Sequence, residues 1–264
     1  MRNVDFMIAW IVIPARNEER RIRNTIEKYS KCVNGKRIGI IVVSSSNDDT
    51  DSIVSEYSKK YNFIKLIKSR EREGKGGAII KGFIRAMKDK PDFIGFLDAD
   101  GSVGCAEFLR MLRLLESNKR IDGVIASRYS IGSTIRGGIP ASRFVASRAY
   151  NLLIRLLFRI DVKDTQCGAK IFRTRAISNV VSSLTILGMS FDVDLLYSLK
   201  LKGRKIVELG VAYDQSNEGT SISIARNAPQ MLAAAFGFRI YKSRFGVLIP
   251  KSLTRFAYNR IKRW

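Results

Sequence analysis

Two carboxylates one residue apart carry the sharpest chemical signal in the chain. Asp98 and Asp100 follow the apolar run Phe93–Leu97 and stand before Gly101. Alternate residues of a strand share a face, so both carboxylates can point the same way, where they repel unless a cation lies beside them. A hard ion such as Mg²⁺ or Mn²⁺, held also by substrate phosphates, suits them. We predict a metal site here, with a solvated Asp-Gly turn as the alternative.

Basic side chains and a glycine-rich turn could bind phosphate. The segment Glu73–Ala78 opens a helix, where backbone N–H groups and Lys75 can meet a phosphate, although it is not a Walker A loop. Arg128 ends an apolar run, and Arg143 and Ser147 are four residues apart on a basic helical segment. That spacing puts both on one helix face, where they can grip one phosphate. The alternatives are an ordinary helix entry and solvated arginines.

Three other polar clusters have local explanations as well. In Pro14–Glu19, the side chain of Asn17 can cap a helix that begins with acidic residues. The segment Asp164–Lys170 gathers polar groups before a short apolar run. Asp192 and Asp194 fall in the first turn of a predicted helix, where the helix dipole favours acids.

The composition excludes several kinds of catalysis. The chain has no histidine, which rules out Ser-His-Asp and Cys-His catalysis, histidine-ligated zinc and a histidine base. Its three cysteines, Cys32, Cys105 and Cys167, are far apart and odd in number. We therefore expect no zinc site, no disulfide framework and a reducing compartment. Catalysis must use carboxylates, a hard metal, basic side chains and backbone dipoles.

Length and charge restrict the class of protein. The 264 residues, 45% of them hydrophobic, suffice for one large domain or two small ones with a substantial core. The 47 Lys and Arg against 24 Asp and Glu give a formal charge of +23. Such a basic protein is expected to meet a polyanion: nucleic acid, anionic lipid or a phosphorylated substrate.

The elements that must position these groups alternate in type. Apolar runs at 8–13, 38–43, 63–67, 93–97 and 123–126 are separated by amphipathic stretches near 18–31, 49–60, 76–88 and 105–117. This alternation predicts a doubly wound, mostly parallel α/β sheet with helices on both faces and ligands at the carboxyl ends of its strands. Farther on, we predict helices at 141–158, 174–182 and 191–202 and strands at 169–172 and 205–213.

The C-terminal segment differs from the rest. We expect neither a cleaved signal sequence nor a membrane-spanning helix in this chain. From 228 to 264 every charge is Lys or Arg, interleaved with aromatic and aliphatic residues. We predict a catalytic domain over 1–227 and basic amphipathic, membrane-associating helices over 228–264. The alternative packs their apolar side against the catalytic domain.

The polar segments, taken in order, resemble a known family. "PARNEE", "GKGGA", "DADG", "ASRY", "DTQCGAK" and "FDVDLL" recur over roughly residues 8–220. Their order and spacing resemble glycosyltransferase family 2, with its Rossmann-like GT-A fold, and within it the synthases of polyprenyl-phosphate and dolichyl-phosphate hexoses. The resemblance implies inverting transfer of glucose or mannose from UDP-glucose or GDP-mannose to a polyprenyl or dolichyl phosphate, with Mg²⁺ or Mn²⁺. Because that acceptor would lie in a bilayer and the C-terminal segment is basic and amphipathic, we predict a peripheral place on the cytoplasmic face of a membrane.

The resemblance further implies a role for each matching residue. Asp98 and Asp100 would be the metal-binding pair, and with Arg128 and Arg143 they would be the catalytic groups. The acceptor phosphate would meet Arg128, Arg143 and Ser147. The nucleotide sugar would be bound by Pro14, Ala15, Arg16, Glu18, Ser44, Lys75, Asp98, Ala99 and Asp100. The sugar pocket would include Asp164, Thr165 and Gln166.

Two positions depart from the family pattern. The family usually shows an acid where this chain has Ser44, in "VVSSSNDDT", which leaves the identity of the base open. Ser102 stands where many mannosyl relatives carry Gln. Both UDP-glucose and GDP-mannose therefore stay as donor hypotheses.

The predicted reaction needs no general base. A lipid monophosphate is largely a dianion at neutral pH and can attack the sugar directly, which inverts the anomeric centre. The remaining work is charge neutralisation, by arginines at the acceptor and by metal at the leaving group. The alternatives are a nucleic-acid-binding protein, a sugar nucleotidyltransferase, although its Gly-rich N-terminal loop is missing, and a family 2 enzyme with a protein or polysaccharide acceptor. The last would need a carboxylate base, sought in "FDVD".

Overall fold

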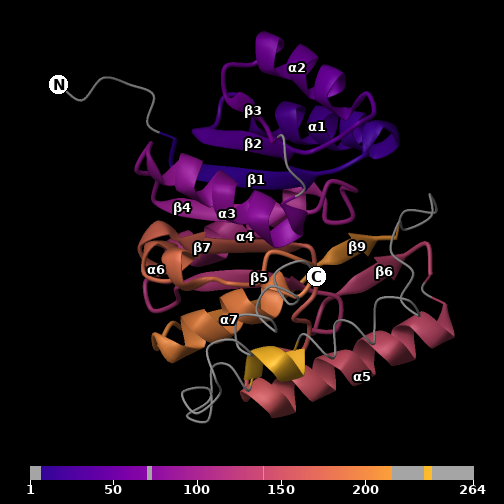
Figure 1. The fold of residues 1–264 in the computed structure, drawn as a ribbon, viewed down its shortest axis with the longest axis vertical. Coiled ribbons are helices and arrows are strands. Elements are labelled where there is room, and N and C mark those ends of the chain that lie inside the picture. Colours follow the sequence, from indigo (N-terminus) through magenta and orange to yellow (C-terminus); the bar gives the residue numbers. More distant parts are fainter. Residues whose placement is uncertain (1–6, 70–72, 139, 216–234, 240–264) are drawn as a thin grey trace, which may run out of the picture.

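A seven-stranded sheet forms the centre of the molecule. The computed structural model describes residues 7–69, 73–138, 140–215 and 235–239. The strands are β1 (Ala9–Ala15), β2 (Ile38–Ser44), β3 (Ile64–Lys68), β4 (Phe93–Leu97), β5 (Gly123–Ser127), β6 (Thr134–Arg136), β7 (Ala169–Arg173), β8 (Ile206–Gly210) and β9 (Ala212–Asp214). The large sheet has the order β3-β2-β1-β4-β7-β5-β8, and β6 pairs with β9 beside it (Figure 1).

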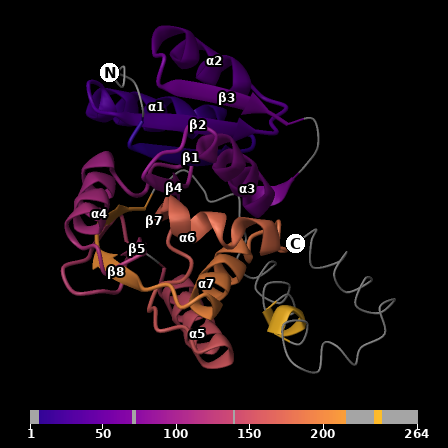
Figure 2. The same ribbon diagram turned by 90° about the vertical axis from the view of Figure 1, so that its left-hand side faces the viewer.

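Helices cover both faces of the sheet. They are α1 (Glu19–Val33), α2 (Thr50–Lys60), α3 (Gly74–Met87), α4 (Cys105–Ser117), α5 (Ala141–Phe158), α6 (Thr174–Ser178) and α7 (Phe191–Leu201), with a 3₁₀ turn at Val181–Ser183. Figure 2 shows α1 and α4 on one side of the sheet and α3, α6 and α7 on the other. This arrangement confirms the predicted α/β fold, mostly parallel with helices on both faces.

The strands are parallel except at one place. β1 pairs in parallel with β2, from Ala9 opposite Ile38 to Ala15 opposite Ser44, and also with β4. β7 runs antiparallel between β4 and β5. All residues of β2, β4 and β5 are buried, as expected for strands covered on both faces. The carboxyl ends of β1, β2, β4 and β5 and the amino end of β7 therefore share one edge.

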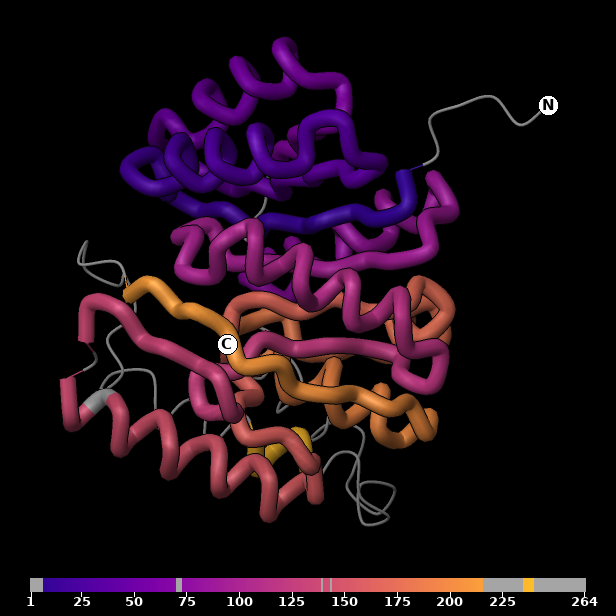
Figure 3. The backbone as a smooth tube through the Cα atoms, turned by 180° about the vertical axis from the view of Figure 1, so that it is seen from behind, coloured from indigo at the N-terminus to yellow at the C-terminus, as the bar shows by residue number. Residues whose placement is uncertain are grey.

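A disulfide corrects the prediction made from the cysteine spacing. Cys32 of α1 and Cys105 at the start of α4 are joined, with their Cα atoms 6.4 Å apart. Their sequence separation of 73 made the pair look remote, but α1 and α4 pack on the same face of the sheet (Figure 3). Cys167 is buried and free. The expectation of no disulfide was wrong, and the reducing compartment inferred from it loses that support.

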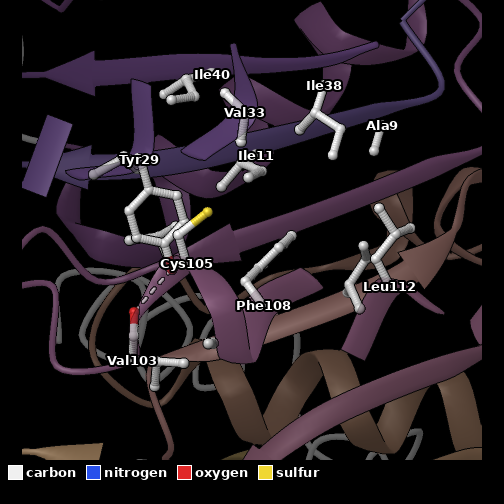
Figure 4. Close-up of a cluster of buried hydrophobic side chains, with 14 of the residues drawn as sticks. Ala9, Ile11, Tyr29, Val33, Ile38, Ile40, Val103, Cys105, Phe108 and Leu112 are labelled. Carbon is white, nitrogen blue, oxygen red and sulfur yellow. Dashed lines mark hydrogen bonds between the residues drawn. The ribbon is translucent and has the colours of Figure 1, made fainter. Parts of the chain in front are cut away.

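The core around the disulfide ties α1 to the segment after β4. Tyr29, fully buried, lies near the ring of Phe108 and donates its hydroxyl to the backbone oxygen of Val103 at 2.8 Å (Figure 4). Burial raises the pKa of the Tyr29 hydroxyl, so it remains a donor. The loop that carries Asp98 and Asp100 is thus anchored from one side by α1.

The C-terminal half shows where the sequence patterns were ambiguous. The helix predicted at 141–158 is α5, whereas the strand predicted at 205–213 divides into β8 and β9, which belong to different sheets. β6 was not predicted. Within the described residues, no helix is both long and apolar enough to cross a bilayer. Most of the predicted region 228–264 lies outside the described residues. Its helical turn at 235–239 packs Ala235 and Phe238 against the core beside α5 and α7.

Candidate active site

The two carboxylates lie where the sequence predicted, at the carboxyl end of β4. Gly101 turns the chain with a φ of 68°, and Asp100 Oδ1 accepts a hydrogen bond from the Ser102 N–H at 2.9 Å. The Thr25 hydroxyl holds the same turn by donating to the Ala99 oxygen at 2.8 Å. A small cavity opens between the carboxylates and is lined by Leu97, Asp98, Asp100, Ser102, Val103, Gly168 and Tyr213.

Lys75 pairs with Asp98, the first carboxylate, and Lys170 pairs with the neighbouring Asp192. Lys75 Nζ lies 2.7 Å from Asp98 Oδ1 and 3.7 Å from Asp192 Oδ2. Behind it, the fully buried Lys170 pairs with Asp192 Oδ1. Burial raises the pKa of Asp98 despite the ammonium of Lys75, and burial would lower the pKa of Lys75, but Asp98 and Asp192 together raise it. Lys75 was predicted on a phosphate; here its partner is the first carboxylate.

The residues present fit a hard divalent cation. Asp98 and Asp100 both line one small cavity, and the Asp98 side chain is 36% exposed despite its pairing with Lys75. Among the described residues, no group of three or more Asp, Glu or Cys could hold a metal. The other ligands would therefore come from substrate phosphates and water, as is usual for Mg²⁺.

Hydrogen bonds join the loops that follow β1 and β2. The Asn17 N–H donates to Ser46 Oγ at 2.9 Å, and the Asn47 N–H donates to Asn17 Oδ1 at 3.0 Å. Asn17 has a φ of 54°, in the left-handed region that Asn tolerates better than most residues. Ser44 is buried at the end of β2, with its hydroxyl 2.9 Å from that of Ser46. The predicted nucleotide-binding loops therefore form one surface.

The predicted nucleotide-binding residues at the end of β1 and just after it differ in exposure. Ala15 is buried, Pro14 and Glu18 are half-buried, and Arg16 is exposed. The Glu18 N–H donates to Thr50 Oγ1 at 2.8 Å, and its carboxylate pairs with Arg21. Burial raises the pKa of Glu18, against the influence of Arg21. Their contacts with a nucleotide stay a prediction.

Arg128 lies at the end of β5, as predicted, but most of its guanidinium is engaged in an ion pair with Asp164. Its Nε and Nη2 donate to the two oxygens of the buried Asp164 carboxylate, each at 2.8 Å. Burial would lower the pKa of Arg128, but the ion pair raises it. This bidentate contact fixes the plane of the guanidinium and leaves Nη1 outside the pair. Asp164 was predicted near the sugar; the structure places it beneath Arg128.

Helix α5 adds a hydroxyl and a cation beside Arg128. Ser147 Oγ lies 3.0 Å from the Tyr129 hydroxyl, and the guanidinium of Arg148 lies 4.7 Å from the centre of the Tyr129 ring. Arg143 occupies the position one turn before Ser147 on the same helix. Of the acceptor residues predicted from sequence, Arg128 and Ser147 thus both lie beside Tyr129, which sequence reasoning did not assign.

Tyr213 is a second site residue that sequence reasoning missed. Its ring lines the cavity between Asp98 and Asp100, and its centre lies 5.3 Å from the guanidinium carbon of Arg128. Burial raises the pKa of its hydroxyl to about 12. In the sequence it ended a predicted strand, where a tyrosine looks like an ordinary packing residue. An antiparallel bridge between Tyr213 and Val103, and a hydrogen bond from the Asp214 N–H to the Ser102 oxygen at 2.8 Å, bring it to the site, and no local pattern in the sequence shows these contacts.

The segment before β7 supports the site from below. Thr165 is fully buried and donates both its N–H and its hydroxyl to Asn151 Oδ1 at 2.8 Å. Gln166 is half-buried. A role for Asp164, Thr165 and Gln166 toward a sugar stays a prediction.

Comparisons with known proteins agree with this geometry. The mostly parallel sheet with helices on both faces is the architecture of the GT-A fold. The sequence profile of Glycosyl transferase family 2 matches residues 10–181, and the chain belongs to this family. This membership favours a glycosyltransferase over the nucleic-acid-binding and nucleotidyltransferase alternatives.

Individual relatives add detail. The chain is 28% identical to the dolichyl-phosphate beta-glucosyltransferase of Drosophila melanogaster, over 71% of this chain and 61% of the fly protein, so it spans less than two thirds of that relative. It is 24% identical to the polyprenol monophosphomannose synthase of Mycolicibacterium smegmatis, over 87% and 86% of the two chains. The fold resembles glucosyl-3-phosphoglycerate synthase from Mycobacterium tuberculosis, crystallised with Mn²⁺, UDP and phosphoglyceric acid. The TM-score is 0.65 at 18% identity, over 88% of this chain and 78% of that one.

Proposed function

We propose that the chain transfers a hexose from UDP-glucose or GDP-mannose to the phosphate of a polyprenyl or dolichyl phosphate. The single observation that carries the proposal is the position of Tyr213. One ring lines the cavity of Asp98 and Asp100 and also lies 5.3 Å from the guanidinium carbon of Arg128. A donor pyrophosphate at the carboxylates and an acceptor phosphate near the arginine would be neighbours.

The donor half is a metal site with a nucleotide surface beside it. Asp98 and Asp100 would hold Mg²⁺ or Mn²⁺, which when bound would neutralise charge on the leaving diphosphate. Pro14, Arg16 and Glu18 would meet the nucleotide. The Mn²⁺ and UDP bound by the structural neighbour support this half of the proposal. The names of the relatives support both a glucosyl and a mannosyl donor.

The acceptor half uses cations rather than a base. Arg128, Arg143 and Ser147 would bind the lipid phosphate, whose dianion attacks the sugar with inversion. The carboxylates of "FDVD" do not suit a base for a protein or polysaccharide acceptor. Asp192 is buried and pairs with Lys170, and Asp194 Oδ2 accepts hydrogen bonds from the backbone of residues 185 and 186. This observation favours an acceptor that is already ionised.

Helix α5 offers a surface for the membrane that would contain the acceptor. Val145, Leu152 and Leu156 are 63%, 54% and 70% exposed and follow one another at helical spacings. The helix contains Arg143, Arg148 and Arg155 and no acidic residue. Exposed apolar residues with basic neighbours favour an anionic lipid surface, so we infer a peripheral membrane association. Its other side carries Ser147.

A panel of nucleotide sugars tests the proposal. The protein is incubated with polyprenyl phosphate and each sugar, with Mg²⁺, Mn²⁺ or a chelator, and lipid-linked sugar is measured. We expect product from UDP-glucose or GDP-mannose, in the β configuration, and loss of product with chelator. The absence of lipid-linked sugar with every donor would contradict the proposal, whereas transfer to a protein or polysaccharide would support the alternative acceptor.

A further inference from the structure

Lys75 has two carboxylate partners, only one of which it fully engages. Its ammonium lies 2.7 Å from Asp98 Oδ1, within hydrogen-bond distance, but 3.7 Å from Asp192 Oδ2. Its side chain is only 13% exposed and faces both carboxylates. Lys75 therefore already neutralises the carboxylate charge of Asp98 that a divalent cation would also bind.

The two carboxylate oxygens of Asp192 differ in their partners. Its Oδ1 pairs with Lys170, which also donates to the Cys167 oxygen at 2.8 Å. Its Oδ2 is buried and has no hydrogen-bond partner within the described part of the chain. A buried carboxylate oxygen without a donor is unfavourable, so a nearby ammonium gains by moving onto it. Lys75 is the ammonium within reach.

We propose that Lys75 is a built-in counter-cation of Asp98 that moves onto Asp192 Oδ2 when a divalent metal binds at Asp98 and Asp100. Asp192 is then a positioning residue, since it touches neither metal nor substrate but receives the displaced lysine. The inference rests on the metal site of the proposed function. Without metal, three carboxylates and two ammonium groups leave one net negative charge in this network. Binding of a divalent metal would change the net charge of this network to one positive, which favours binding of an anionic diphosphate.

Metal affinity in the absence of substrates tests the exchange. Mn²⁺ binding to the full chain is measured from the electron paramagnetic resonance signal of free Mn²⁺. Lys75→Met removes the competing ammonium, so we expect about tenfold tighter Mn²⁺ binding, the scale on which a neighbouring charge shifts an ionic equilibrium. Lys81→Met is the matched control: the same helix loses the same charge, but Lys81 pairs with Glu73 and contacts Ser69. The control should bind Mn²⁺ as the unmodified chain does.

A second substitution tests the proposed role of Asp192 as the group that receives Lys75. Asp192→Asn keeps an oxygen for Lys170 but removes the carboxylate that would receive Lys75. We expect about tenfold weaker Mn²⁺ binding in the unmodified background and little change in the Lys75→Met background. Equal weakening in both backgrounds would overturn the exchange, because Asp192 would then act without Lys75.

The comparison of Lys75→Met with Lys81→Met can also overturn the proposal. If Lys75→Met binds Mn²⁺ no more tightly than Lys81→Met, or if neither the unmodified chain nor Lys75→Met binds Mn²⁺, the proposal is wrong. Should Asp192→Asn fail to fold, as judged by circular dichroism, the comparison of Lys75→Met with Lys81→Met decides alone. The assay contains neither sugar nor lipid, so its result is separate from failure of hexose transfer to a lipid.

Discussion

The position of the Asp98 carboxylate depends on Gly168, the residue just before β7. A Cβ atom at residue 168 would come within 2.2 Å of Asp98 Oδ2. The Asp98 N–H also donates to the Gly168 oxygen at 2.8 Å, so the two backbones are held together. The side chain must therefore move if the space is filled.

Gly168→Ala should disturb the metal site more than the fold. The carboxylate lies at the end of a short side chain and can swing away, so we expect Mn²⁺ affinity and turnover to fall at least about tenfold, equivalent to about 1.4 kcal/mol. The thermal melting temperature should change little by comparison. Gly104→Ala is the control, because a Cβ there meets nothing within 4 Å. Unchanged Mn²⁺ affinity in Gly168→Ala would contradict the assigned role of Asp98.

Asp100→Asn separates charge from turn structure. The amide keeps an oxygen for the Ser102 N–H, so the turn should survive, but the charge that faces the metal is lost. We expect a loss of about 3 kcal/mol in transition-state stabilisation, or more than a hundredfold in kcat/KM. Asp100→Ala should be at least as impaired. Near-normal turnover in either variant would sink the assignment.

Residue by residue, the sequence revealed what lies next to a strand end. Asp98, Asp100 and Arg128 could be predicted because each lies within three residues of the end of an apolar run. Tyr213 and Lys170 could not, because their roles depend on contacts that only the folded chain makes. Lys75 was found, but its partner was not, because nothing in the sequence states that α3 begins beside Asp98 and Asp192.

At the scale of elements, α5 connects the site to a surface. Arg143→Ala should impair use of the lipid phosphate and leave donor binding little changed, because Arg143 shares a helix with Ser147, near Tyr129. A lost charge-assisted hydrogen bond is worth about 1.5–3 kcal/mol, which would raise the KM for lipid phosphate or lower kcat tenfold or more. The exposed Arg113 of α4 provides a control by Arg113→Ala. Loss of donor binding with normal acceptor use would reverse the roles.

The disulfide between α1 and α4 should stabilise the fold. Closing a loop of 73 residues restricts the unfolded chain by about 4 kcal/mol in the chain-entropy account. Cys32→Ser should therefore unfold at a clearly lower denaturant concentration than the oxidised chain, and reductant should lower the stability of the unmodified chain to a similar value. Cys167→Ser, which affects the free cysteine, provides the comparison. Equal stability with and without reductant would show that the bond contributes nothing.

Elements in the first half were predictable because each strand and helix repeats one simple pattern. The helix at 105–117 and the strand at 93–97 match α4 and β4. The small sheet of β6 and β9 was not foreseen, because three-residue strands leave no periodic signal. The antiparallel direction of β7 also has no signature in its own five residues.

At the scale of the whole molecule, the charge of +23 calls for an anionic surface. The segment 228–264 contains eight basic residues and no acid: Arg239, Lys242, Arg244, Lys251, Arg255, Arg260, Lys262 and Arg263. Each basic residue near an anionic bilayer contributes about 1 kcal/mol. We expect the full chain to float with anionic liposomes and to be released by high salt.

Two variants locate the source of that binding. A chain ending near residue 227 should stay in solution if the C-terminal segment provides the attraction. The exposed side of α5 is tested by Leu152→Ser together with Leu156→Ser, which should weaken flotation if that helix also contacts lipid. If the full chain remains in solution with anionic liposomes at low salt, the prediction of a peripheral membrane protein is wrong.

The strand order has a consequence for how the chain acquires its shape during synthesis. β7 lies between β4 and β5, so those two strands, consecutive in the sequence apart from α4, are joined in the sheet only through residues 169–173. A ribosome-bound chain of about 130 residues would already possess β1 to β5 but would lack the piece that joins them. Its β4 edge would be open, and the Asp98 N–H would lack the Gly168 oxygen that holds it. The loop that carries Asp98 and Asp100 is therefore expected to become ordered late, when the growing polypeptide has passed residue 173 and β7 can pair with β4 and β5.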